Sequence, residues 1–249
     1  MKKLFTLLAL TLSFSVNAQM SDNSVGTSAT GSNAVAMGKS TTASGGMSTA
    51  MGKSTTASGD MSTAMGRETT ASGEYSTTMG RETTASDYAS LVIGQYNSSG
   101  SSVTNNATSF NTANTAFVIG NGTASNAKSD AFKVMFNGDT TVSNDLTVSG
   151  DVNISSDARL KSNIVSLGST LSKLLQIDGK YYEMKGKQKI GVLAQEIKEV
   201  FPELVSEDDN EMLAVNYQGL VPVLINALKE QEDKISRLEN LVEKLISKK

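Results

Sequence analysis

The chain of 249 residues contains no cysteine and no histidine, carries a net charge of −3, and is only 5% aromatic. These absences exclude disulfides, thiol nucleophiles, Ser-His-Asp triads and the common zinc sites, so we expect neither a bound metal nor a cofactor. The charge gives no indication of a nucleic-acid partner, and the few aromatic residues argue against one conventional core spanning the whole chain.

The first 18 residues have the pattern of an export signal. Lys2 and Lys3 precede an apolar stretch from Leu4 to Val16, and small residues up to Ala18 resemble a cleavage site. The stretch is too short for a permanent anchor, and a membrane tether or a buried helix is the alternative. We expect a signal peptide cut after Ala18, a secreted or cell-surface protein, and no membrane span in the mature chain.

Residues 36–91 repeat with a period of 14. The segment from Ala36 to Gly45 recurs from Ala50 and from Ala64, and more loosely from Thr78. Like residues form two columns: Met37, Met51, Met65 and Met79, and then Met47, Met61 and Tyr75. A fixed period with such columns predicts a solenoid rather than a disordered low-complexity linker.

Each repeat alternates in the manner of a short strand. Ser48, Ala50 and Gly52 share a face that carries only small side chains, whereas Thr49 and Met51 lie on the other face. Glycines allow the chain to turn between strands. This spacing resembles the head repeats of YadA-type trimeric adhesins, which implies a left-handed β-roll. One coil alone would expose its methionines, so we expect three chains to pack side by side.

The repeats also align cations in one column: Lys39, Lys53, Arg67 and Arg81. Stacked like charges repel one another mildly, and Glu68 and Glu82 follow two of these cations and could relieve the repulsion. We interpret the column as a solvated face. The alternative is a site for an anionic surface ligand.

Residues 92–155 lose the period but keep strand signals. Residues 131–136 lead into Asn137-Gly138-Asp139, which is a strong turn sequence. Spaced apolar residues then predict further short strands: Val142, Leu146, Val148, Val152 and Ile154. We interpret this region as a narrow β-rich shaft.

From Ser156 the chain reads as a mixed α and β domain. Residues 180–184 predict a strand that pairs with residues 188–192, and residues 193–200 predict an amphipathic helix that Pro202 ends. Residues 206–211 form an acidic loop. The loop lacks the spacing of an EF-hand, which favours a solvated turn over a calcium site.

The last helix is expected to begin near Pro222 and to continue as a coiled coil. Its apolar residues recur in steps of four and three, with Gln231 in one slot: Leu224, Leu228, Ile235, Leu238, Val242 and Leu245. Ile and Val at a with Leu at d favour two strands by the simplest rule, whereas the fibrous head favours three, which we adopt. Packing of Leu224 and Leu228 against their own domain is an open alternative.

Four segments in order resemble the C-terminal intramolecular chaperone domain of endosialidase-type tailspikes. They are Ser156-Asp157-Ala158-Arg159-Leu160-Lys161-Ser162-Asn163-Ile164, Gly191 to Glu196, Phe201 to Val205, and Tyr217 to Ile225. The resemblance covers residues 156 to about 235. That family forms trimers and cuts itself from its own upstream chain. Some members also use a nearby histidine, which this chain lacks.

The resemblance implies cleavage between Ser155 and Ser156, with Ser156 as nucleophile and Lys161 as general base. Asp157, Arg159 and Asn163 lie in the same motif, and we expect them to orient the loop. A serine hydroxyl needs a base, and a lysine in water has a pKa of about 10.4 and is charged. Burial favours the neutral amine, so we expect the site to become competent only after assembly. Ser155 is an alternative nucleophile whose spacing does not fit.

These observations predict a mainly β, fibrous, trimeric N-terminal part followed by an α+β chaperone domain that ends in a coiled-coil helix. The expected divisions are a signal peptide (1–18), head repeats (19–91), a shaft (92–155), a chaperone and peptidase domain (156–222) and a trimeric helix (223–249). The expected function is that of a homotrimeric fibre whose chaperone domain releases itself. The alternative is a structural adhesin that keeps this domain as a permanent clamp. The export signal argues against a phage tail fibre.

Overall fold

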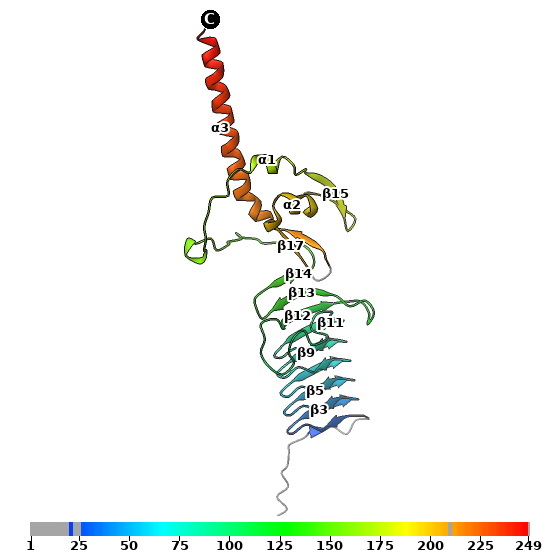
Figure 1. Cartoon of the computed structure of the whole chain (residues 1–249). Helices are drawn as coiled ribbons and strands as arrows, with labels where there is room; N and C mark the ends of the chain where they lie inside the picture. The colour runs from blue at the N-terminus through cyan, green and yellow to red at the C-terminus, as the bar shows by residue number, and fades with distance from the viewer. Residues whose placement is uncertain (1–19, 22–25, 209–210, 249) are drawn as a thin grey trace, which may run out of the picture. The chain divides into compact units, whose positions relative to one another are not determined.

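The computed structural model describes residues 20–21, 26–208 and 211–248. The predicted export signal therefore lies outside the described residues. The chain divides into two compact units, Met1–Val152 and Asn153–Lys249 (Figure 1).

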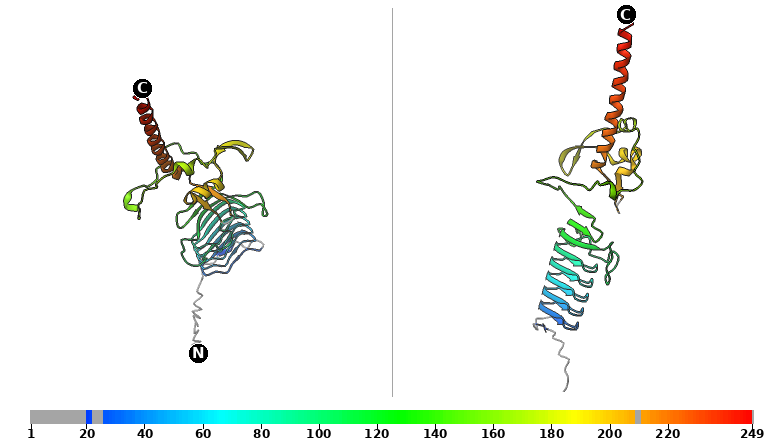
Figure 2. Two further views of the ribbon diagram at one scale, coloured as in Figure 1. Left: turned by 45° about the horizontal axis from the view of Figure 1, so that its top comes forward. Right: turned by 90° about the vertical axis from the view of Figure 1, so that its left-hand side faces the viewer.

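The first unit contains a β-solenoid, as the repeats predict. Successive long strands begin 14 residues apart and pair in parallel and in register, so that Met51 lies between Met37 and Met65. The long strands are β3 (Val35–Lys39), β5 (Thr49–Lys53), β7 (Thr63–Arg67), β9 (Thr77–Arg81) and β11 (Leu91–Gln95). Figure 2 shows them stacked along the solenoid.

Short strands form the second face of each coil. They also pair in parallel at the same offset: β2 (Ser28–Ala29), β4 (Thr42–Ala43), β6 (Thr56–Ala57), β8 (Thr70–Ala71) and β10 (Thr84–Ala85). A two-residue strand β1 (Met20–Ser21) pairs with β3. Two parallel sheets therefore enclose a narrow interior.

The interior of the solenoid contains the small side chains of the predicted face. Ala36, Ala50 and Ala64 are fully buried, and the same column continues through Thr78 to Val92. The methionines of the other face point outward and are half-buried or exposed. Because the interior is filled by alanine, serine and threonine, each coil buries little apolar area.

The turns differ in part from the sequence prediction. Glycines do occupy left-handed positions, such as Gly52 and Gly66. However, Met47, Met61 and Tyr75 also adopt a left-handed backbone, with φ of 56°, 55° and 58°. Left-handed backbone is uncommon for residues other than glycine and asparagine. The sequence therefore did not predict that these two methionines and the tyrosine form turns.

The parallel stack continues beyond the sequence repeats. Strand β12 (Thr115–Asn121) pairs in parallel with β11 after an excursion of the chain over residues 96–114. Asp87 holds the middle of this excursion at Thr104 and the start of β12 at Thr115. The buried carboxylate of Asp87 accepts hydrogen bonds from the backbone N–H of Thr104 at 2.6 Å and of Thr115 at 2.8 Å. Asp87 stands where the preceding repeats have glycine.

An antiparallel hairpin follows, as the Asn-Gly turn predicts. Strand β13 (Asp130–Met135) pairs with both β12 and β14 (Thr140–Val142). The further strands predicted up to residue 154 are wrong, because residues 143–157 contain no strand. Their apolar side chains are exposed, and a strand cannot persist without a neighbour to pair with.

The second unit is a small α+β domain. A hairpin of β15 (Lys180–Met184) and β16 (Lys187–Gly191) agrees with the prediction within one residue, as does helix α2 (Ala194–Val200). The remaining short elements are η1 (Ala158–Leu160), α1 (Leu171–Leu174), η2 (Pro202–Leu204), β17 (Val205–Glu207), β18 (Leu213–Val215) and η3 (Tyr217–Gly219). The acidic loop joins β17 to β18, and its residues 209–210 are not described.

Helix α3 (Leu220–Ile246) is 27 residues long and begins two residues before Pro222. Its first turns complete the core of the unit, in which Val223 packs with Ile197 and Phe201. Beyond these turns the helix leaves the rest of the unit, as both figures show (Figures 1 and 2). Among the described residues, no helix combines the length and the apolarity needed to cross a membrane.

Candidate functional site

The structure brings the two predicted reactive side chains together. The Nζ atom of Lys161 lies 2.7 Å from the Oγ atom of Ser156. As oriented, the ammonium group donates to the hydroxyl. A neutral amine at the same distance could instead accept the hydroxyl proton, which is the geometry that general-base catalysis requires.

A short 3-10 turn creates this contact. Asp157 caps η1 by accepting a hydrogen bond from the backbone N–H of Arg159 at 2.9 Å. The turn reverses the chain, and the N–H of Lys161 donates to the carbonyl of Ala158 at 3.1 Å. Residues five apart thereby face each other.

Arg159 reinforces the same turn. Its guanidinium contacts both carboxylate oxygens of Asp157, with the shortest distance 2.6 Å to Oδ2. The side-chain hydrogen bond from Arg159 is the main cause that holds the pKa of Asp157 below its ordinary value. Asn163 follows the turn with a left-handed backbone, at a φ of 52°. Ser155 precedes the turn, and among the described residues it forms no hydrogen bond with Lys161.

The site is open to solvent in the single chain. Both Ser156 and Lys161 are exposed. Exposed apolar side chains follow closely, including Ile164, Leu167 and Val165, which is 85% exposed. Such a run of uncovered apolar residues is unusual for a segment that stays in water, and a second surface would have to cover it to exclude water.

A second uncovered surface runs along α3. Leu224 and Leu228 are 46% and 65% exposed, so they do not pack on their own domain, which instead buries Val223 and Ala227. The same exposed face continues to the C-terminal end of the helix through Ile235, Leu238, Val242 and Leu245. We call this face, including Leu224, Leu228 and Gln231, the α3 seam.

A third uncovered surface lies on the outer face of the solenoid. Side chains in register form an apolar column that extends beyond the sequence repeats: Met37, Met51, Met65, Met79, Ile93 and Ile119. Met37 is exposed and the others are half-buried. We call this row the head column.

The cation column has the neutralising partners that the sequence predicts. Arg67 pairs with Glu68 at 3.0 Å and Arg81 pairs with Glu82 at 4.0 Å. Contact with Arg67 lowers the pKa of Glu68, chiefly through the side-chain hydrogen bond. The described residues contain no cluster of three or more acidic side chains that could hold a metal ion.

One contact near the site had no signal in the sequence. Residues 168–171, which follow the site loop, are attached to α3 by hydrogen bonds that span about 60 residues of chain. No local pattern predicts such a contact, because it depends on how the domain folds.

Comparisons with known proteins match both parts of the chain. Residues 156–206 match the family model described as "Chaperone of endosialidase", a peptidase family, and this match indicates a self-cleaving peptidase domain. Residues 29–55, 43–69 and 57–82 match the model described as "YadA head domain repeat (2 copies)". No curated protein matches the chain.

These matches indicate a trimeric adhesin-like protein with a chaperone domain, and the head repeats indicate a surface or secreted location. The junction of Ser156 with the preceding chain coincides with the start of the chaperone match. The chain thus combines head repeats of the YadA type with a chaperone domain of the endosialidase type.

Proposed function

We propose that this protein is an exported homotrimeric fibre whose C-terminal domain guides assembly and then cuts itself away between Ser155 and Ser156. The observation that carries this proposal is the 2.7 Å contact between Lys161 Nζ and Ser156 Oγ. A serine and a lysine in contact form the minimal pair for nucleophilic cleavage without histidine.

The proposed chemistry begins with attack of Ser156 Oγ on the carbonyl carbon of Ser155. Lys161 accepts the hydroxyl proton, the peptide bond breaks, and the amine of Ser156 gains a proton. This step produces an ester between the Ser155 carbonyl and Ser156 Oγ. Water then hydrolyses the ester, which leaves a carboxylate on Ser155 and restores the hydroxyl of Ser156.

Assembly supplies the condition that the single chain lacks. A lysine acts as a base only when its neutral form is populated, and removal from water favours that form. The exposed residues Ile164, Val165 and Leu167 are the surface that a neighbouring copy would cover. Covering them would also exclude water from Ser156 and Lys161, so that cleavage would report correct assembly.

The α3 seam and the head column supply surfaces for three copies. The seam is exposed along its whole length, and its heptad spacing places Ile235 and Val242 at a with Leu238 and Leu245 at d. The charges favour a parallel arrangement, because Lys234 at g would meet Glu239 at e of a neighbour. An antiparallel pairing would instead bring the acidic e positions together.

The test is a comparison of the parent with Ser156→Ala and Lys161→Ala on a denaturing gel. We expect the parent alone to release a fragment of residues 156–249. The amino-terminal sequence of this fragment should begin at Ser156. Light scattering on both variants should give three chains, which shows that loss of cleavage does not reflect loss of assembly.

The alternative function is a structural adhesin with an uncut C-terminal clamp. The exposure of Ser156 and Lys161 in the single chain is the observation that favours it. An intact parent chain in a well-folded trimer would support the clamp and exclude self-cleavage. A monomeric parent would exclude both functions.

A further inference from the structure

Helix α3 attaches the chain that follows the candidate site. Ser169 Oγ donates to Glu230 Oε2 at 2.7 Å, the backbone N–H of Leu171 donates to Oε1 at 3.1 Å, and the N–H of Thr170 donates to the same oxygen. Thr170 Oγ1 also donates to the carbonyl of Val223 at 2.9 Å. We call residues 168–171 together with Glu230 the latch.

Burial and hydrogen bonds to a charged group both stabilise the latch. Thr170 is only 1% exposed, and both carboxylate oxygens of Glu230 accept hydrogen bonds. Hydrogen bonds to a charged carboxylate are stronger than those between neutral groups. Asn226 adds a further contact through its Nδ2 atom, 3.3 Å from the carbonyl of Gly168.

The latch contains the first hydrogen bonds that the chain after Lys161 makes to the rest of the domain. Among the described residues, the hydrogen bonds of residues 155–167 stay within residues 155–168. Lys161 is therefore connected to the folded domain through a short segment whose hydrogen bonds to the rest of the domain begin at Gly168. The position of this attachment limits where Lys161 and Ser156 can lie.

The latch and the α3 seam use different faces of the same helix. Val223 and Glu230 both fall at heptad position c, and Asn226 falls at f, whereas the seam consists of the a and d positions. Helix α3 can therefore hold residues 168–171 and pack against neighbouring copies at the same time. Because α3 is one continuous helix from Leu220 to Ile246, packing of its seam also fixes the orientation of Glu230.

We propose that Glu230 is a positioning residue that couples assembly of α3 to cleavage at Ser156. This inference rests on the proposed function. Glu230 contacts neither Ser156 nor Lys161. It holds the chain downstream of Lys161 on the helix that assembles, so the site loop is presented to the neighbouring copy only when the helices are in place. Nothing in the immediate sequence around Ser156 supplies this connection.

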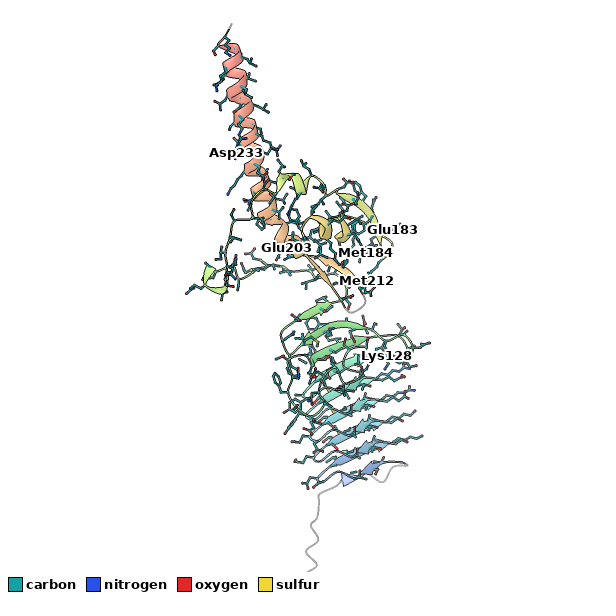
Figure 3. All side chains as sticks on the ribbon, in the orientation of Figure 1. Lys128, Glu183, Met184, Glu203, Met212 and Asp233 are labelled. Carbon is teal, nitrogen blue, oxygen red and sulfur yellow. The ribbon has the colours of Figure 1, made fainter. Side chains whose placement is uncertain are left out.

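The test compares Glu230→Ala and Glu230→Gln with the control Asp233→Ala in the full chain. Asp233 lies nearly one turn further along α3 (Figure 3), and its side chain forms no hydrogen bond or ion pair among the described residues. Trimers of each variant are isolated by size and their cleavage rates are measured. Glu230→Ala should cleave about 10-fold to 100-fold more slowly, which is the range expected for misplaced reacting groups.

Further variants separate positioning from general destabilisation. Glu230→Gln keeps one carbonyl oxygen and should cleave at an intermediate rate. Ser169→Ala should slow cleavage, but it should add little to the effect of Glu230→Ala, because both changes remove the same hydrogen bond. A purely structural role would lower the yield of trimer without changing the rate within trimers. Cleavage at the parental rate in Glu230→Ala trimers would overturn the inference and leave the proposed function intact.

Hydrogen exchange supplies a readout that does not need cleavage. In the Ser156→Ala background, Glu230→Ala should speed exchange across residues 156–171 while residues 235–246 stay protected. Equal exchange with and without Glu230 would overturn the inference. An uncut parent whose residues 156–171 are ordered by Glu230 would instead overturn self-cleavage and support the latch as part of a permanent clamp.

Discussion

At the scale of single residues, close approach of successive coils dictates where glycine is required. A Cβ atom at Gly66 would lie 2.1 Å from the carbonyl oxygen of Gly80, and Gly66 also has a φ of +122°. At Gly46 a Cβ atom would lie 3.5 Å from Asp60 Oδ1, which is an ordinary contact. The repeat therefore contains glycines with a strict packing role beside others without one.

The first prediction uses this contrast. Gly66→Ala should destabilise the head by at least about 2 kcal/mol, because both the backbone conformation and the neighbouring coil must shift. Gly46→Ala should leave stability nearly unchanged. Thermal unfolding of the two variants in the uncleavable Ser156→Ala chain, followed by circular dichroism, makes the comparison. Equal melting temperatures would contradict the close packing of coils.

A second prediction at this scale concerns the charge of Glu230. The hydrogen bond from Ser169 is the main cause that holds the pKa of this carboxyl below its ordinary value of 4.5, followed by the bond from the backbone N–H of Thr170. Because the folded-state pKa is lowered, the contact stabilises the fold fully above about pH 4.5 and this stabilisation is lost as the pH falls through the folded pKa. The denaturation midpoints of the parent and Glu230→Gln should therefore approach one another as the pH falls below about 4.5.

Asp233→Asn is the control for this comparison. It removes a carboxylate from the same helix, outside the latch, and should not reproduce the difference seen at neutral pH for Glu230→Gln. A constant gap between the parent and Glu230→Gln at every pH would show that the carboxylate charge does not stabilise the latch. All variants should contain Ser156→Ala, so that cleavage does not alter the midpoint.

At the scale of elements, α3 serves two purposes along its length. Its first turns bury Val223 and Ala227 in the domain core, whereas the α3 seam is exposed throughout. An isolated helix with so many exposed aliphatic side chains would associate in water, because burying each one contributes roughly 1.5–3 kcal/mol. In the proposed function, assembly would therefore begin at this helix.

The third prediction tests the seam directly. Leu238→Asp places a charge at a d position and should convert the trimer to monomer, since burying an unpaired carboxylate is strongly unfavourable. Ser236→Asp adds the same charge two residues earlier, at position b, and should leave the trimer intact. Analytical ultracentrifugation of both variants gives the number of chains. A trimeric Leu238→Asp variant would show that the seam is not the interface.

At the scale of the whole molecule, the repeats of the head specify the register between neighbouring chains only weakly. Successive repeats are nearly identical, so a slip of 14 residues between chains would still match methionine with methionine along the head column. Weakly specified register and non-local strand pairing both slow folding. In the proposed function, a domain that first joins three chains at one defined point would remove this ambiguity, and its loss afterwards would leave the fibre kinetically stable.

The fourth prediction concerns how refolding of the head depends on the C-terminal domain. After complete denaturation and dilution, uncleaved Ser156→Ala should recover its trimers, whereas cleaved parent should not recover its head trimers. Both should unfold slowly. Light scattering and circular dichroism before and after refolding make the comparison. Equal recovery of the two proteins would show that the C-terminal domain is not needed for assembly.

The sequence by itself determined the solenoid, the hairpins β13–β14 and β15–β16, and the heptad helix, because each depends on a local period or a turn signal such as Asn137-Gly138. The resemblance of residues 156–164 to the endosialidase-type chaperone motif also pointed to Ser156 and Lys161. Predicted strands after Val142 failed for a physical reason: alternation of apolar residues makes a strand only where a partner strand lies beside it.

Only the tertiary structure decided the contacts between distant residues. It placed Met47 and Tyr75 in left-handed turns, extended the stack through β12, and attached residues 168–171 to Glu230. It also showed which face of α3 the domain buries, which the heptad alone left open. Such choices depend on which surfaces meet when the chain folds, and no local pattern encodes contacts across some 60 residues.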